Sequence, residues 1–196
     1  MKIYVSFLNS AEYKSLLRPF GASSYYPIIK ERWKNAIIID NESDATSIAG
    51  YKIKFPSKIP SDYDLQFGVI EITSNDDRLA CLFYSKESLT DSMRFNEFFK
   101  QEGIWITYRK WASPKESSFD FNIPNYMRTL KKEGRDGYEI TINGRKGLAS
   151  SERDRLFHGV DIHDPSQVEF TMEETHVTLR GYLKKETLIK VAESIN

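Results

Sequence analysis

Alternating apolar and polar positions recur along the chain and predict a series of β-strands. The segment Tyr51–Phe55 alternates between apolar and charged residues, and Ile104–Trp111 alternates with aromatic residues on both faces. Further strands are expected over 65–73, 78–85, 138–143, 145–150, 168–172 and 176–182. Short polar turns such as Asn143–Gly144 separate neighbouring strands, so we expect the strands to pair as antiparallel hairpins.

Helical spacing of apolar residues interrupts these hairpins. Helices are expected over 10–18, 27–36, 43–50, 91–101, 124–133 and 185–195. Pro124 would lie in the first turn of its helix, and Gly50 would follow the end of another. Because hairpins are interrupted by helices rather than alternating with them singly, the pattern predicts an α+β fold with helices packed on one antiparallel sheet.

The segment 104–111 presents two partly apolar faces, and this leaves two interpretations open. One face carries Trp105, Thr107, Arg109 and Trp111, and the other carries Ile104, Ile106, Tyr108 and Lys110. Either one face belongs to the core and the other is covered by another element, or one face forms an apolar groove. The groove would bind a lipid chain or a partner peptide. Its expected lining is Trp105, Trp111, Phe119 and Phe121, the last two on one face of an extended segment.

Composition limits the class of protein without naming its function. The 196 residues suit one domain, and 40% hydrophobic residues are enough for a core. The formal net charge is +0, so the basic footprint of a nucleic-acid-binding protein is absent and we expect no nucleic-acid partner. No stretch approaches the roughly 18 apolar residues of a membrane span. The single cysteine, Cys81, lies in an apolar strand and is expected to be a buried, inert thiol.

Residues with catalytic or metal-binding chemistry are sparse. His158, Asp161, His163 and Asp164 are ligand types for a divalent ion, but their spacing matches no closed site and a polar loop is favoured. The segment Asn143–Gly147 lacks the spacing of a phosphate-binding loop, and the chain has no motif of a nucleophilic hydrolase or zinc protease. We therefore expect no catalytic residues, no metal and no cofactor.

Two groups of short motifs resemble a known domain family. The first comprises Asp44–Tyr51, Lys52–Pro56 and Ile59–Tyr63, and the second comprises Val177–Leu183 and Val191–Ile195. Together they resemble the opening and the closing segments of the DUF4367 family, a prokaryotic domain family of unknown function. Gly50 and Gly181 in these motifs are expected to supply backbone freedom at a helix cap and at a strand exit.

The resemblance implies a fold, a location and the absence of catalysis. It implies a curved antiparallel sheet wrapped around helices, as in the LolA/RseB-like lipoprotein carriers and sensors. It also implies residence outside the cytoplasm, as in the anti-sigma factors and lipoproteins that carry the domain, with the leader or anchor absent from this chain. Two segments depart from the family pattern: a helical arm or linker over 1–42, and a charged insert over 150–165. The expected domain is 43–196.

These observations favour a non-catalytic, extracytoplasmic module that binds or senses a ligand. The ligand would be an apolar molecule, such as a lipid or lipoprotein, or a partner protein, and peripheral association with a membrane is a further expectation. The main alternative is a structural interaction domain of a cell-envelope assembly, and an enzyme of unknown type is the third. The oligomeric state is left open.

Overall fold

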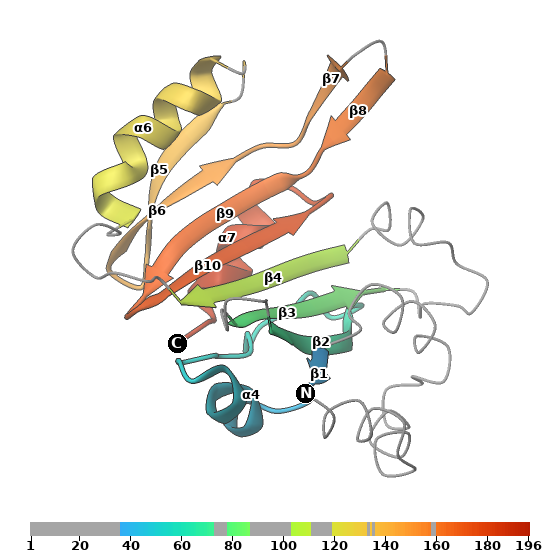
Figure 1. The fold of residues 1–196 in the computed structure, drawn as a ribbon. Coiled ribbons are helices and arrows are strands. Elements are labelled where there is room, and N and C mark those ends of the chain that lie inside the picture. The colour runs from blue at the N-terminus through green and yellow to red at the C-terminus, as the bar shows by residue number, and fades with distance from the viewer. Residues whose placement is uncertain are drawn as a thin grey trace.

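The fold is known from a computed structural model that describes residues 36–72, 78–86, 103–110, 119–132, 134, 136–157 and 160–196. Its main feature is an antiparallel eight-stranded sheet with strand order β1-β2-β3-β4-β10-β9-β6-β5 (Figure 1). The strands of this sheet are β1 (Ala36–Ile38), β2 (Asp64–Ile72), β3 (Arg78–Ser85), β4 (Gly103–Lys110), β5 (Gly137–Ile142), β6 (Arg145–Ser150), β9 (Ser166–Met172) and β10 (Thr175–Gly181). The expected α+β class and most expected strands are therefore confirmed.

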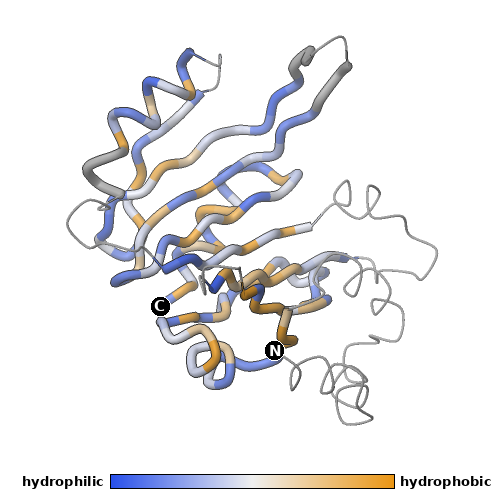
Figure 2. Tube along the Cα trace, viewed as in Figure 1, coloured by the Kyte–Doolittle hydropathy of each residue, from blue (hydrophilic) through white to orange (hydrophobic). Residues whose placement is uncertain are grey.

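One face of the sheet carries the hydrophobic core. Strand alternation directs Ile104, Ile106 and Tyr108 of β4 to this face, and all three are fully buried. Of the described helices, two cover it: α4 (Glu42–Ala49) over β2 and β3, and α7 (Lys185–Glu193) over β9 and β10 (Figure 1). Hydrophobic positions are most continuous in β1, β2 and β3, as the orange colouring of Figure 2 shows.

The opposite face is covered at one end by α6 (Phe119–Lys132), which lies over β5 and β6. Ile123, Leu130 and Leu148 form a small second core there. The helix α6 packs closely against β5, because a Cβ atom on Gly137 of β5 would lie 2.7 Å from Leu130 Cδ1 of the helix. The expected helix began at Pro124, but α6 starts at Phe119 and holds Pro124 in its interior. The helix therefore begins more than one turn before Pro124, the residue at which the sequence predicted its first turn.

The segment 51–55 does not form the expected strand, although Tyr51 and Ile53 are buried and Phe55 is half-buried. The backbone N–H of Ile53 donates to Thr46 Oγ1 at 3.1 Å, and that of Phe55 donates to Glu42 Oε1 at 2.8 Å. Side chains of α4 thus satisfy the backbone groups that a strand would satisfy by pairing. The alternating pattern of this segment arises because every second side chain faces the core. It does not indicate that the segment pairs with another strand.

The insert before β9 forms a hairpin rather than the expected polar loop. Its strands are β7 (Arg153–Phe157) and β8 (Val160–Asp164), which among the described strands form a separate two-stranded sheet (Figure 1). At the other end of the chain, β1 pairs with β2, so the sheet starts before residue 43. The helices expected over 10–18 and 91–101 lie outside the described residues. The division of the chain at residue 42 stays a prediction.

Candidate functional site

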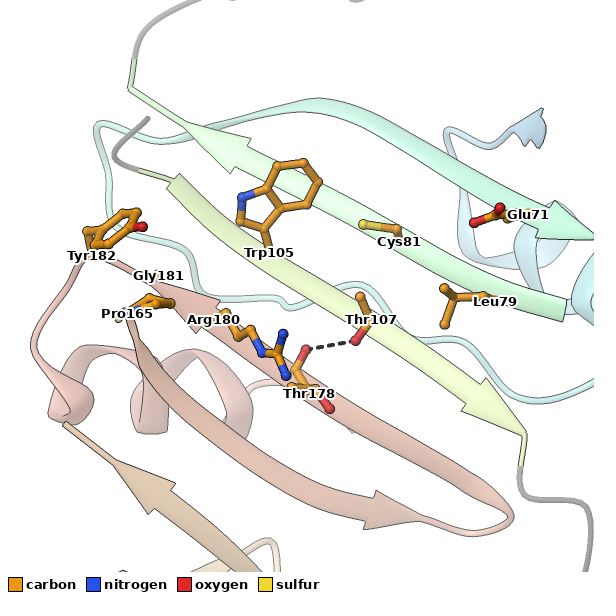
Figure 3. Close-up of a pocket in the computed structure, with 10 residues that line it drawn as sticks. All are labelled: Glu71, Leu79, Cys81, Trp105, Thr107, Pro165, Thr178, Arg180, Gly181 and Tyr182. Atoms are coloured by element: carbon orange, nitrogen blue, oxygen red, sulfur yellow. Dashed lines mark hydrogen bonds between the residues drawn. The ribbon is translucent and has the colours of Figure 1, made fainter. Parts of the chain in front are cut away.

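A cavity of about 370 Å³ lies on the face of the sheet opposite α7. This volume is in the range of roughly 300–1,000 Å³ that is usual for small-molecule sites. Side chains of β2, β3, β4 and β10 form its floor, and residues flanking β9 and β10 form one end (Figure 3). Its lining residues are Glu71, Leu79, Cys81, Trp105, Thr107, Pro165, Thr178, Arg180, Gly181 and Tyr182.

Strand register sets which residues lie side by side in this floor. Trp105 on β4 is directly opposite Phe83 on one neighbouring strand and Arg180 on the other. Arg180 in turn is directly opposite Gln167 on β9. Directly opposed residues of antiparallel strands share a face, with Cβ atoms about 5 Å apart. The row from Phe83 to Gln167 therefore changes from aromatic to polar within four strands.

The apolar part of the floor is built around Trp105. Its indole lies against Phe83, with ring centroids 4.3 Å apart, and against Phe67 at 5.7 Å in an edge-on arrangement. Both phenylalanines are buried, whereas Trp105 is half-buried and lines the cavity. The two rings hold the indole in place from behind and leave it as an apolar wall of the cavity.

The polar part of the floor is a chain of contacts that ends at Arg180. The Arg180 Nε–H donates to Gln167 Oε1 at 2.8 Å, and the Gln167 amide donates to Glu169 Oε1. The other oxygen of Glu169 lies 3.2 Å from His176 Nε2. Glu169 is only 5% exposed, so it provides a fixed anchor for the exposed Arg180. The guanidinium is thus oriented by a neutral amide rather than by a carboxylate.

Cys81 and Glu71 add two further chemical groups to the lining. Burial, with the Glu71 carboxylate nearby, raises the pKa of the Cys81 thiol to about 12. The thiol is therefore protonated at neutral pH, in agreement with the expected inert cysteine. Glu71 and Leu79 lie at one end of the cavity, and Tyr182 and Pro165 lie at the other (Figure 3).

The β7–β8 hairpin is attached to the cavity through Tyr182. The Tyr182 ring stacks on the His163 imidazole, with centroids 5.3 Å apart. His163 Nδ1 lies 2.6 Å from Asp154 Oδ1, and Nε2 lies 3.5 Å from Glu152 Oε2. The hydrogen bond to Asp154, with both carboxylates nearby, raises the pKa of His163 above its ordinary value. An imidazole held between two carboxylates thus supports one wall residue, Tyr182.

Of the four residues expected to line a groove, Trp105 lines this cavity. Trp111 and the side chains of Phe119 and Phe121 lie outside the described part of the chain. The backbone of both phenylalanines belongs to α6, so the strand-like alternation used to pair them does not apply. Sequence analysis missed Arg180, Thr178 and Tyr182. The polar positions of 176–182 signalled a second face, but no local pattern indicates that this strand pairs with β4.

Of the four metal-ligand types noted in the sequence, only His163 and Asp164 have side chains in the described part of the chain, and each contacts different partners. Asp164 Oδ2 lies 3.4 Å from Arg153 Nε, and His163 contacts the two carboxylates described above. His158 and the side chain of Asp161 lie outside the described residues. Within the described part of the chain, no three His, Cys, Asp or Glu side chains are grouped as metal ligands.

Comparison with known proteins identifies the domain family. The sequence model of the family described as Domain of unknown function (DUF4367) matches residues 56–195. The chain belongs to the DUF4367 family. The cavity therefore lies within the DUF4367 domain. No curated protein and no solved structure gives a significant match. Among the described helices of the domain, none has the length and apolar character needed to cross a bilayer.

The two motif groups of the DUF4367 domain meet in space. Ser194 Oγ accepts a hydrogen bond from the Lys58 N–H at 3.1 Å, and the Ser57 N–H donates to Ser194 O at 3.3 Å. The Tyr51 hydroxyl lies 2.7 Å from Tyr108 O and 2.8 Å from Arg78 O. These residues join chain segments on the core side of the sheet and do not line the cavity.

Proposed function

We propose that the DUF4367 domain of this chain is a non-catalytic binding module that holds an apolar small molecule in the cavity over β2, β3, β4 and β10. The observation that carries this proposal is the placement of Trp105. Its half-buried indole is held by Phe67 and Phe83 and forms a wall of a cavity of about 370 Å³. A supported aromatic wall in a concave site is a common basis for binding apolar ligands.

The chemistry of the lining favours binding over catalysis. The one thiol in it, Cys81, has its pKa raised to about 12, so it is a poor nucleophile at neutral pH. Leu79, Trp105, Pro165 and Tyr182 offer contact area and no proton-transfer group that works near pH 7. The alternative of a structural interaction domain would use this face for protein contact, and the experiment below distinguishes the two.

We further propose that the domain acts outside the cytoplasm, as a sensor or carrier of a lipid-like molecule next to a membrane. The support is the resemblance of its motifs to domains of anti-sigma factors and lipoproteins. An antiparallel sheet with helices on its core face agrees with the proposed relation to the LolA/RseB-like lipoprotein-carrier and sensor fold. The wall of the cavity supplies the apolar surface that such a role needs.

The test is binding of N-phenyl-1-naphthylamine, a neutral apolar dye whose fluorescence rises in apolar surroundings. We expect saturable binding at one site of the purified chain. Thr107→Phe fills the cavity from the centre of β4 while keeping a residue suited to a strand, and it should weaken dye binding at least about tenfold. Trp105→Leu should weaken it by loss of the aromatic wall.

The matched control is Tyr138→Ala, which removes an exposed aromatic side chain from β5, away from the cavity. Dye binding should be unchanged in this variant. Circular dichroism and thermal unfolding establish that each variant is folded. Absence of saturable binding by the native chain, or equal binding by folded Thr107→Phe and native protein, would contradict the proposal.

A further inference from the structure

We infer that the ligand of this cavity is an amphiphile whose anionic group, a carboxylate or a phosphate, binds Arg180 while its apolar part lies against Trp105. The inference rests on the proposed function, since it assigns the chemical class of ligand to the same cavity. The observations that carry it are the register of β4 and β10 and the polar partners of Arg180.

The register places a cation and an indole side by side. Arg180 and Trp105 are directly opposed on β10 and β4, and both line the cavity (Figure 3). A ligand lying across the strands would contact the indole with one part and the guanidinium with the next. The row continues to buried Phe83 on the apolar side and to Gln167 on the polar side. This order fixes the direction of an amphiphile in the cavity.

Arg180 forms no direct ion pair with an acid in the described part of the chain. Among the described residues, no carboxylate lies within 4.0 Å of its guanidinium, and its hydrogen-bond acceptor is the neutral Gln167 amide. The nearest acid of this network, Glu169, is engaged by Gln167 and by His176. Only the Nε–H of Arg180 is used in that contact, so the two terminal nitrogens can form the paired hydrogen bonds that carboxylates and phosphates accept.

At the other end the lining of the cavity includes an acid, and the nearest cation of that register row, Arg109, lies outside the lining. Glu71 lies at that end (Figure 3) and, among the described residues, has no cation within 4.0 Å. Its carboxylate would repel an anionic group there and favour one at Arg180. Charge and hydrophobicity therefore select the same orientation, with the head group at Arg180 and the chain over Trp105 and Leu79.

The test is displacement of the bound dye by ten-carbon amphiphiles that differ in head group. Decanoate and decyl phosphate should displace N-phenyl-1-naphthylamine at concentrations at least about tenfold lower than decanol or decyltrimethylammonium, because a charge-assisted pair to Arg180 is available only to the anions. In Arg180→Gln this preference should disappear while the dye still binds. The control Arg145→Gln removes an arginine of β6 outside the cavity lining and should keep the preference.

The outcomes separate this inference from the proposed function. Dye binding without a preference for anions, or a preference that survives Arg180→Gln, would overturn the inference and leave the apolar site intact. Absence of dye binding by the native chain would overturn both. Equal displacement by decanoate and decyl phosphate indicates any anionic head group, and stronger displacement by decyl phosphate indicates a phospholipid-like one. If inorganic phosphate displaced the dye at the same concentration as decyl phosphate, the apolar chain would not contribute to binding. The inference that the ligand is an amphiphile would then be wrong.

Discussion

At the scale of single residues, Gly181 is a motif glycine that the fold requires, but the reason differs from the one that the sequence suggested. The sequence suggested that Gly50 and Gly181 both supply backbone freedom. Gly50 does so, because it ends α4 with φ of 73°. Gly181 is not among the positive-φ residues, and its role is steric. A Cβ at this position would lie 2.6 Å from the carbonyl oxygen of Gly103 on β4.

Gly181→Ala should therefore destabilise the domain by about 1–3 kcal/mol, the usual cost of forcing extra atoms into a packed position. The contact is with backbone, which cannot move aside without disturbing the pairing of β4 and β10. Urea unfolding followed by circular dichroism measures the change in the free energy of unfolding. A change below about 0.5 kcal/mol, the range of neutral surface substitutions, would show that the steric explanation is incorrect.

At the scale of elements, the β7–β8 hairpin illustrates how a charged segment becomes ordered. Its end is fixed by polar contacts: Arg153 pairs with Asp164, and His163 lies between Asp154 and Glu152. The stacked Tyr182 connects this cluster to the strand that carries Arg180. These contacts hold the base of the hairpin, and the contact at His163 depends on the protonation of the imidazole.

His163→Asn should remove a stability term that depends on pH. The Asp154 and Glu152 carboxylates raise the pKa of His163 in the folded state above the ordinary value of 6.5. The protonated form is thus bound more tightly by the folded state. Its contribution is complete below pH 6.5 and is lost as the pH rises through the folded-state pKa.

The melting temperatures of native and His163→Asn protein measure this term between pH 5.5 and 9. The native protein should melt higher at pH 5.5, by at most about 3 °C because the pair is exposed, and the difference should vanish at pH 9. All other residues are common to both proteins, so their contributions cancel in the difference. A difference in melting temperature that grows as the pH rises would contradict the prediction that the His163 contact stabilises the fold at low pH.

At the scale of the whole molecule, hydrogen bonds connect the opening and closing segments of the DUF4367 domain. Ser194, just after α7, binds the segment after Pro56 through both its hydroxyl and its carbonyl group. Asn143, in the β5–β6 turn, donates through Nδ2 to the carbonyl oxygens of Glu193 and Ile195, each at 3.1 Å. The opening segment, the closing helix and the β5–β6 hairpin at the sheet edge therefore meet at one corner on the core side of the sheet.

Ser194→Ala should lower the free energy of unfolding by about 1–2 kcal/mol. The hydroxyl is buried and bonds to Lys58 N–H, so its removal leaves a backbone donor without its partner. Chemical denaturation measures this loss. Because the corner lies away from the cavity, dye affinity should not change, and a variant that loses affinity without losing stability would contradict this separation of roles.

Much of the fold could be predicted because it depends on local pattern. Alternation in Ile104–Trp111 assigned Ile104, Ile106 and Tyr108 to one face, and these residues are in the core. The Asn143–Gly144 pair marked a hairpin, and both residues have positive φ there. The strand expected over 51–55 was wrong, because the pattern records burial and does not say whether α4 side chains or a neighbouring strand bind the backbone.

The candidate site could be predicted only in part. By itself, the sequence determined the α+β class, most of the strands and the burial of Cys81, and it proposed Trp105 as a groove residue. Only the tertiary structure decided that β4 lies between β3 and β10, and hence that Arg180 is beside Trp105 and across from Gln167. The physical reason is that alternation assigns a residue to a face of its own strand, whereas its neighbours depend on strand order and register. These are fixed by packing of the whole sheet against α4 and α7.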